Sequence, residues 1–325
     1  MNLSRRKFLH LAAGAAALPA LLHVARAQTY PSRPVRVLVG YAAGGPADTF
    51  ARLVGQPLTE RLRQAFIIEN RPGAGSNIAA EAVAKSAPDG HTLFLTTAAN
   101  AINATLYKDL RFEFVNDFAP VATLSREPLV VSKSLSIEAN TVPQFVSYAK
   151  ANPEKIIMAS AGNGTVSHVS GELFKMLTGI NMTHVPYRGA APALIDLLAA
   201  RVDVYFSPMS GAISYIRAGR LHALAVTTRN GSEVLPDTPS VSESVPGYES
   251  SQWYGLAAPI KTPAEIIEKL NTAINAILTE TNFKQRLADL GANTFSQSPM
   301  EFTQLLTKET EKWGKVVKFS GARPD

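Results

Sequence analysis

The 325-residue chain contains no cysteine. This absence excludes disulfide bonds, thiol nucleophiles, iron–sulfur clusters and cysteine-ligated zinc. The chain also lacks an apolar run of the ~20 residues that a membrane-spanning helix requires. We therefore expect a soluble protein, long enough for two domains that each bury an ordinary hydrophobic core.

A strong net charge is missing once the N-terminal segment is set aside. The chain has 32 basic and 26 acidic residues, and residues 1–27 hold four of the basic ones and no acidic one, which leaves a net charge of +2. No basic tract, zinc-finger spacing or RNA-binding aromatic motif is present. We expect no nucleic-acid partner.

The motifs of nucleotide binding and catalysis are missing as well. The glycine-rich turn at 40–49 lacks the G-K-[ST] ending of a phosphate-binding loop, and the turn at 162–167 has Ser167 where G-x-G-x-x-G needs its third glycine. There is no G-x-S-x-G or H-E-x-x-H, and Ser147-x-x-Lys150 lacks partner motifs. No two histidines after residue 27 have the spacing of metal ligands on one helix. We expect no catalytic residue, cofactor or metal site.

The first 27 residues have the pattern of a cleaved export signal. Arg5 and Arg6 precede an apolar stretch at 9–24, which ends at Ala25–Arg26–Ala27. The arginine pair predicts a twin-arginine signal and a periplasmic protein. The alternative is a membrane anchor, for which the apolar stretch is short.

The rest of the chain alternates between strand and helix patterns. We expect strands at 35–39, 66–68, 92–97, 156–159, 202–206 and 222–227, and helices at 46–63, 76–85, 142–151, 166–177, 190–198, 212–218, 263–279 and 301–317. This alternation favours mostly parallel sheets covered by helices, an α/β class.

Small and hydroxyl residues follow five of these strands, at Gly44–Gly45, 71–77, 98–100, 160–165 and 207–210. Ligands of parallel sheets bind beyond the carboxyl ends of the strands. Small residues there let backbone N–H groups approach a ligand, and helix N-termini favour an anion. Glycine and serine are common in such turns without any ligand, but five together predict a lined cleft.

An ordered set of short motifs resembles one family along the whole chain after residue 27. The motifs are Gly44–Asp48 with Ala51–Arg52, Asn70–Gly75, Ala87–Leu93, Val185–Ala193, Val202–Asp203 and Leu235–Val241. They resemble the substrate-binding proteins of tripartite tricarboxylate transporters, the Bug family. Two departures, His91 for the usual tyrosine and Ala200 for the usual glycine, lie at positions we expect to be peripheral.

The resemblance implies a two-domain periplasmic-binding-protein (Venus flytrap) fold, with a sheet flanked by helices in each domain. We predict domain 1 from residues 28–125 and 255–325, and domain 2 from 126–254, with crossings near 123–131 and 253–258. It also implies a monomeric receptor that binds a small carboxylate, such as a di- or tricarboxylate or an aromatic acid, between the domains. The receptor would deliver this ligand to membrane permease subunits.

The resemblance carries over a set of ligand-binding residues from both predicted domains. In domain 1 they are Ala43, Gly44, Gly45, Asp48, Ser76, Asn77, Thr97 and Ala99. In domain 2 they are Gly164, Thr165, Ser167, His168, Tyr187, Arg188, Ala190 and Ser207.

Several of these residues have an expected role. Gly44 and Gly45 would offer backbone N–H groups, and Thr97 and Thr165 would offer hydroxyls. Asp48 would cap the helix or order a water molecule rather than touch the carboxylate.

Two further roles stay open. Arg188 is either a partner for a second carboxylate or a structural surface arginine. His168 is either a donor to the ligand or a solvated residue at a helix start.

Two other functions stay open from the sequence. One is an exported α/β hydrolase or isomerase that acts on a small carboxylate. The other is a receptor that serves a sensor kinase instead of a permease.

Overall fold

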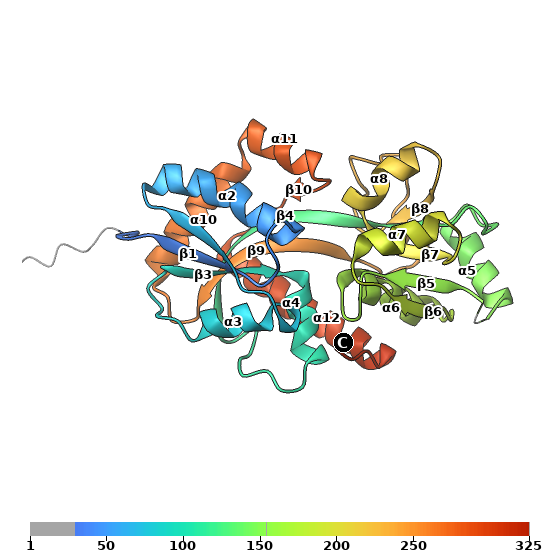
Figure 1. Cartoon of the computed structure of the whole chain (residues 1–325), viewed down its shortest axis with the longest axis horizontal. Helices are drawn as coiled ribbons and strands as arrows, with labels where there is room; N and C mark the ends of the chain where they lie inside the picture. Colours follow the sequence, from blue (N-terminus) through green and yellow to red (C-terminus); the bar gives the residue numbers. More distant parts are fainter. Residues whose placement is uncertain (1–29, 154, 325) are drawn as a thin grey trace, which may run out of the picture.

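The computed structural model describes residues 30–153 and 155–324. The predicted export signal at 1–27 lies outside the described residues. Figure 1 shows two groups of strands and helices side by side, joined by two long strands, β4 (Phe118–Lys133) and β9 (Ser251–Pro259).

The first half of the molecule contains a parallel core of three strands. β1 (Val35–Val39) lies between β2 (Phe66–Asn70) and β3 (Thr92–Thr97), and all three are parallel. β9 pairs with β3 in the antiparallel direction, and β4 pairs with β9. The side chains of β1 are buried on both faces, as expected for a strand covered by helices on both sides.

The second half continues the same order of strands. The sheet runs β2-β1-β3-β9-β4-β7-β5-β6, in which β7 (Val204–Pro208), β5 (Ile157–Ser160) and β6 (Thr183–Pro186) are parallel to one another. β7 and β8 (His222–Val226) are antiparallel to the last residues of β4, and the short β10 (Asn293–Thr294) pairs with its middle. β4 therefore hydrogen-bonds to strands of both halves.

Helices cover both faces of the sheet. In the first half, one face packs against α2 (Pro46–Leu62), α10 (Ala264–Leu278) and α11 (Thr281–Asp289), and the other against α3 (Asn77–Ala84), α4 (Ala98–Leu106) and α12 (Pro299–Ser320). In the second half, the helices are α5 (Val142–Ala151), α6 (Val166–Thr178), α7 (Ala190–Leu198), α8 (Met209–Arg217) and α9 (Val241–Ser244).

One buried apolar cluster extends through both halves. It includes Phe94 of β3, Phe206 of β7 and Trp313 of α12, all with 0% exposure. α12 belongs to the end of the chain and contacts α4, β4 and α6 (Figure 1). The C-terminal helix α12 thus packs against both halves on one face of the sheet.

The observed elements differ from the expected ones in a few places. The sequence patterns missed α4, α9, α11, β6 and β10, and β7 begins at Val204 because residues 201–203 form a bend. α4 was missed because the small residues at 98–100 were interpreted as a loop after the strand at 92–97, although Thr97 and Asn100 form a capping box at its start. The predicted domain boundaries fall inside β4 and β9, which continue through them, and stay a prediction.

Candidate binding site

The β1–α2 loop satisfies its own polar groups. Gly44 has a φ of 81° and its N–H donates to Asp48 Oδ2 over 2.9 Å, while the Gly45 N–H donates to the Ala42 carbonyl over 3.4 Å. Both donors that we expected to meet a ligand are therefore used inside the loop. Ala43 is exposed at its tip.

Asp48 is 3% exposed and is the centre of this loop. Besides the Gly44 N–H, it accepts from Arg52 Nε at 2.9 Å and from Asn70 Nδ2 at 3.0 Å. The hydrogen bond from Arg52 is the main reason why the pKa of Asp48 is lowered. Asp48 therefore orders the loop rather than capping α2, whose N-cap is Gly45, and its carboxylate is already occupied.

Ser76 has strained backbone and an unused hydroxyl. It lies at the N-cap of α3 with φ of 82°, and Ala74 and Gly75 before it also have positive φ. The side chain is 1% exposed, yet its Oγ makes no capping bond and has no hydrogen-bond partner among the described residues. A strained non-glycine residue with an unsatisfied buried hydroxyl is typical of functional sites.

Asn77 presents a free amide donor beside Ser76. Its Oδ1 accepts from Asn103 Nδ2 over 3.1 Å, and Asn103 also donates to the Gly75 carbonyl over 2.7 Å. With the oxygen fixed by α4, the Nδ2 group of Asn77 has no hydrogen-bond partner in the described part of the chain. The side chain is 6% exposed.

The β3–α4 junction supplies a third free donor. Asn100 Oδ1 accepts from the Thr97 N–H at 2.8 Å, which completes the capping box and leaves Asn100 Nδ2 without a partner among residues 30–153 and 155–324. Thr97 Oγ1 lies 3.3 Å from the Tyr41 hydroxyl. Ala99 is half-buried in the first turn of α4.

These three donors belong to one place in the fold. Ser76 and Asn77 are adjacent at the start of α3, and Asn103 brings Asn77 against α4, where Asn100 lies one turn earlier on the same helix face. We call Ser76, Asn77 and Asn100 the donor cluster. All three are uncharged, so the cluster offers N–H and O–H groups without a cation.

The loop after β5 in the second half is closed by its own hydrogen bonds. Thr165 Oγ1 donates to the Gly162 carbonyl over 2.7 Å, and Ser167 Oγ accepts from the Ala161 N–H over 2.9 Å. The Gly164 N–H donates to His168 Nδ1 over 3.1 Å. The hydroxyl and backbone groups predicted to bind a ligand are thus engaged within the loop.

His168 belongs to a buried group of titratable side chains. Its ring stacks on His184 with centroids 3.8 Å apart, and its Nε2 lies 3.8 Å from Glu172 Oε1. Burial, the charge of His184 and the charge of Lys175 lower the pKa of His168 to about 3. His168 is therefore neutral at physiological pH, and with Nδ1 accepting from Gly164 its Nε2 carries the proton.

Four other predicted residues are spread around the second half. Tyr187 donates its hydroxyl to Asp196 over 2.7 Å, and burial together with this contact raises the pKa of Tyr187 to about 12. Arg188 is exposed, Ala190 begins α7, and Ser207 is buried and bonded to Ser132 over 2.9 Å. No contact joins the Arg188 side chain to the other predicted residues in the part of the chain that the structure describes.

The two halves touch beside the loop after β5. A Cβ atom on Gly164, which has a φ of 68°, would collide with Leu106 Cδ2 at the end of α4. Gly164 therefore lets this loop approach the helix that carries Asn100. This contact and that between α4 and α6 bring together elements that carry residues of the two predicted sets.

Gly40 and Asn100 are not among the predicted ligand-binding residues, although they lie in the segments 40–49 and 98–100 named from the sequence, and each had a signal. Gly40 follows β1, and a Cβ there would lie 2.6 Å from Ser76 Cα, so glycine is required for the close approach of these two loops. Asn100 follows Thr97 by three residues, the spacing of a capping box.

Comparison with known proteins decides the family. The model of the tripartite tricarboxylate transporter family receptor matches residues 50–321. The chain belongs to this family. It is therefore a receptor and not an enzyme, and the predicted family is confirmed.

Curated relatives of this receptor align over nearly their whole length. A UPF0065 protein of Agrobacterium vitis is 37% identical over 92% of this chain and 88% of its own. Protein BugT of Bordetella pertussis is 31% identical over 91% of this chain and 92% of its own.

Solved structures confirm the predicted periplasmic-binding-protein fold of the receptor. An adipate-bound protein of R. palustris is 35% identical with a TM-score of 0.77, and covers 91% of this chain and 100% of its own. MatC of Rhodopseudomonas palustris with bound malate is 34% identical with a TM-score of 0.74, over 89% and 100%. The periplasmic binding protein BugD is 31% identical with a TM-score of 0.74, over 91% and 100%.

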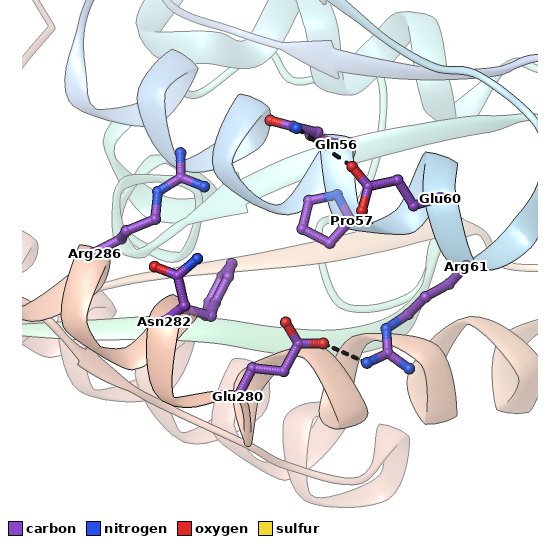
Figure 2. Close-up of a pocket in the computed structure, with 8 residues that line it drawn as sticks. Gln56, Pro57, Glu60, Arg61, Glu280, Asn282 and Arg286 are labelled. Atoms are coloured by element: carbon purple, nitrogen blue, oxygen red, sulfur yellow. Dashed lines mark hydrogen bonds and ion pairs between the residues drawn. The ribbon is translucent and has the colours of Figure 1, made fainter.

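A surface pocket of the receptor lies away from the predicted binding residues. Figure 2 shows it between α2 and α11, with a volume of about 370 Å³. Arg61 and Glu280 form an ion pair across it, and Gln56 donates to Glu60 over 3.3 Å. None of the residues that line it is in the predicted set.

No group of three or more His, Asp or Glu side chains in residues 30–153 and 155–324 is placed to hold a metal ion. Within the same residues, no helix combines the length and the hydrophobicity that crossing a membrane demands.

Proposed function

We propose that this receptor binds a small carboxylate between its two halves and delivers it to the membrane permease of a tripartite tricarboxylate-type transporter. The two halves correspond to the predicted domains, 28–125 with 255–325 and 126–254. The proposed site comprises the donor cluster and the loop after β5, approached from opposite sides.

The donor cluster is the observation that carries this proposal. A buried polar group without a partner costs about 1–3 kcal/mol, and the cluster contains three of them: Ser76 Oγ, Asn77 Nδ2 and Asn100 Nδ2. A ligand that accepts hydrogen bonds would remove this cost. Hydrogen bonds to an ionised acceptor are about twice as strong as neutral ones, which favours an anion.

The shape of the anion is suggested by the relatives. Two of the similar solved structures hold adipate and malate, which are both carboxylates. A planar carboxylate has about four acceptor positions, enough for all three donors of the cluster. Di- and tricarboxylates and aromatic acids fit this description, and the permease partner follows from the family of the chain.

Ser76→Ala tests the proposal on the exported chain, residues 28–325. The substitution removes a hydroxyl with no partner, so we expect the melting temperature without ligand to stay the same or to rise. One charge-assisted bond is worth about 1.5–3 kcal/mol, so affinity for a bound carboxylate should fall by about 10- to 100-fold. Calorimetry with a panel of carboxylates measures this change.

Two controls sharpen the test. Ser86→Ala removes a surface hydroxyl that donates to the Val83 carbonyl over 2.8 Å, far from the donor cluster, and should leave affinity unchanged. The diamide of the same ligand should bind much more weakly than the acid. Equal binding of acid and amide, or wild-type affinity of Ser76→Ala, would contradict the proposal.

A further inference from the structure

α4 buries two asparagines on one face, although asparagine is a poor helix former and is mostly exposed in folded proteins. Asn100 is 2% exposed and Asn103, one turn later, is 3% exposed. Asn100 has a local reason for its place, because its Oδ1 completes the capping box at the start of the helix. Asn103 lies beyond that box, and the contacts that satisfy its amide come from another segment of the chain.

The amide nitrogen of Asn103 is used completely by the segment 75–77. Nδ2 donates to the Gly75 carbonyl over 2.7 Å and to Asn77 Oδ1 over 3.1 Å. A side-chain amide nitrogen carries two hydrogens, and each of them has its own acceptor here. Asn103 therefore has no N–H group left for a ligand.

These two contacts determine which way both amides face. A backbone carbonyl can only accept, so the Asn103 atom beside Gly75 is the nitrogen rather than the oxygen. The same nitrogen meets Asn77, so the Asn77 atom beside it is the oxygen. The Asn77 nitrogen is left on the other branch of its amide, as a donor without a partner among residues 30–153 and 155–324. A fixed acceptor in the backbone is thus the origin of this free donor.

The bond to Gly75 also supports the turn that carries Ser76. Ala74, Gly75 and Ser76 all have positive φ, of 46°, 61° and 82°. Backbone of this kind persists only where its surroundings hold it in place. One side chain of α4 therefore holds the backbone before Ser76 and the amide of Asn77, which are two of the three members of the donor cluster.

We propose that Asn103 is a positioning residue: it orients the Asn77 amide so that the donor cluster presents N–H groups and selects an ionised carboxylate over the corresponding amide. This inference rests on the proposed function, because the donor cluster is the part of the site that holds the carboxylate. If the Asn77 amide were reversed, its oxygen would face the ligand and repel a carboxylate oxygen. An amide ligand, which has an NH₂ group of its own, would then be accepted.

Asn103→Asp tests this role, because it keeps the shape of the side chain and replaces the donor with an acceptor. Asn77 Nδ2 then turns toward the new carboxylate, and Oδ1 turns toward the ligand. The probes are adipate, malate, citrate and benzoate, each with its amide, measured by calorimetry on residues 28–325. In the wild type, the acid that binds most tightly should bind at least about 10-fold more tightly than its amide, and Asn103→Asp should reduce this ratio by about 10-fold or more.

A double-mutant cycle separates the orientation of Asn77 from the added charge. Asn77→Ala removes the amide that Asn103 orients, so the further change Asn103→Asp should alter the ratio by less than about 3-fold. Repulsion between the new carboxylate and the ligand does not need Asn77, and it would lower the ratio equally in both backgrounds. Asn103→Leu adds no charge and leaves the Asn77 amide free to turn, so it should lower the ratio by about 3- to 10-fold. This variant decides the question where Asn103→Asp does not fold.

Asn271→Asp is the matched control. Asn271 is a helical asparagine of α10 whose Nδ2 also donates to two carbonyls, those of Val121 over 2.8 Å and Gln297 over 3.0 Å. α10 covers the opposite face of the sheet from α4, so this variant should lose stability and keep the wild-type ratio. The melting temperature without ligand verifies that each variant is folded.

The outcomes separate the two proposals. A fall of the ratio that depends on Asn77 supports the positioning role. If the Asn103 variants weaken acid and amide by the same factor, or if the ratio falls equally with and without Asn77, the positioning role is overturned and the receptor function stands. A wild type that binds none of the four acids, or binds acid and amide equally, overturns both.

Discussion

The two parts of the proposed site use their polar groups in opposite ways. In the first half, Ser76, Asn77 and Asn100 keep donors that are buried and unpaired, and Ser76 has strained backbone. In the second half, Thr165 and Ser167 are bonded within their own loop. Under the proposed function, the first half offers free donors before any ligand arrives, whereas the second half exchanges internal hydrogen bonds for ligand contacts.

The largest expected effect comes from removing two donors at once. The double substitution Ser76→Ala with Asn77→Ala takes away two bonds to an anion, each worth about 1.5–3 kcal/mol. Affinity for a bound carboxylate should fall by about 100-fold or more. Calorimetry gives the affinity. A loss of affinity smaller than that of Ser76→Ala alone would contradict the idea that the first half supplies the free donors.

Gly40→Ala tests whether the close approach of Gly40, after β1, to the loop that carries Ser76 positions the donor cluster for binding. A Cβ at this position would lie 2.6 Å from Ser76 Cα, so the loop that carries Ser76 must shift. Overpacking of this kind costs about 1–3 kcal/mol, and we expect both a lower melting temperature and weaker carboxylate binding. Gly321→Ala, in the exposed turn after α12 where a Cβ meets nothing within 4 Å, is the control for a change away from the proposed site: its φ of 65° adds left-handed strain that Gly40 does not have, so it should lower the melting temperature and still bind normally.

The histidine pair makes the second half sensitive to acid. The pKa of His168 is about 3 in the fold and about 6.5 in an unfolded chain, so the unfolded state binds more protons between these values. The contribution of His168 is fully present above pH 6.5 and is lost as the pH falls toward 3. Between pH 7.5 and pH 5 this amounts to a loss of about 2 kcal/mol.

His168→Gln isolates that contribution. Glu127 and Glu172 have raised pKa values because of burial, and their contributions change with pH in the opposite direction. The free energy of unfolding is measured with urea at the two pH values in wild type and variant. The contributions of Glu127 and Glu172 are present in both proteins, so they cancel in the difference. An equal pH dependence in both proteins would contradict the assignment.

The smallest expected effect is that of Ser167→Ala, in the loop after β5 of the second half. Ser167→Ala removes the acceptor of the Ala161 N–H, so we expect a loss of about 1 kcal/mol in the free energy of unfolding. Affinity should change less than in Ser76→Ala. In thermal melts, Ser167→Ala should therefore lower the melting temperature more than Ser76→Ala does. In calorimetry, Ser76→Ala should lower the affinity more than Ser167→Ala does.

Much of the fold could be predicted from the sequence, because apolar periodicity is strong in elements such as β1 and α6. α4 was missed because its first residues, the small side chains at 98–100, have the composition of a loop that follows a strand. In the proposed site, short motifs directed attention to Ser76 and Asn77. Whether a donor is free depends on contacts between distant segments, such as Asn103 with Asn77, and the sequence alone does not contain that information.

The same limit explains Gly44. Glycine in a loop suggested open N–H groups, but the neighbouring Asp48 occupies that of Gly44.

The continuity of β4 has a consequence for how the molecule unfolds. The strand pairs with β9 over Phe118–Pro128 and with β7 over Leu129–Lys133, and an apolar cluster extends across the same junction. Neither half can lose its sheet without breaking hydrogen bonds that belong to the other. Calorimetry should therefore record a single cooperative transition, with equal calorimetric and van't Hoff enthalpies, in a chain that has the outline of two bodies.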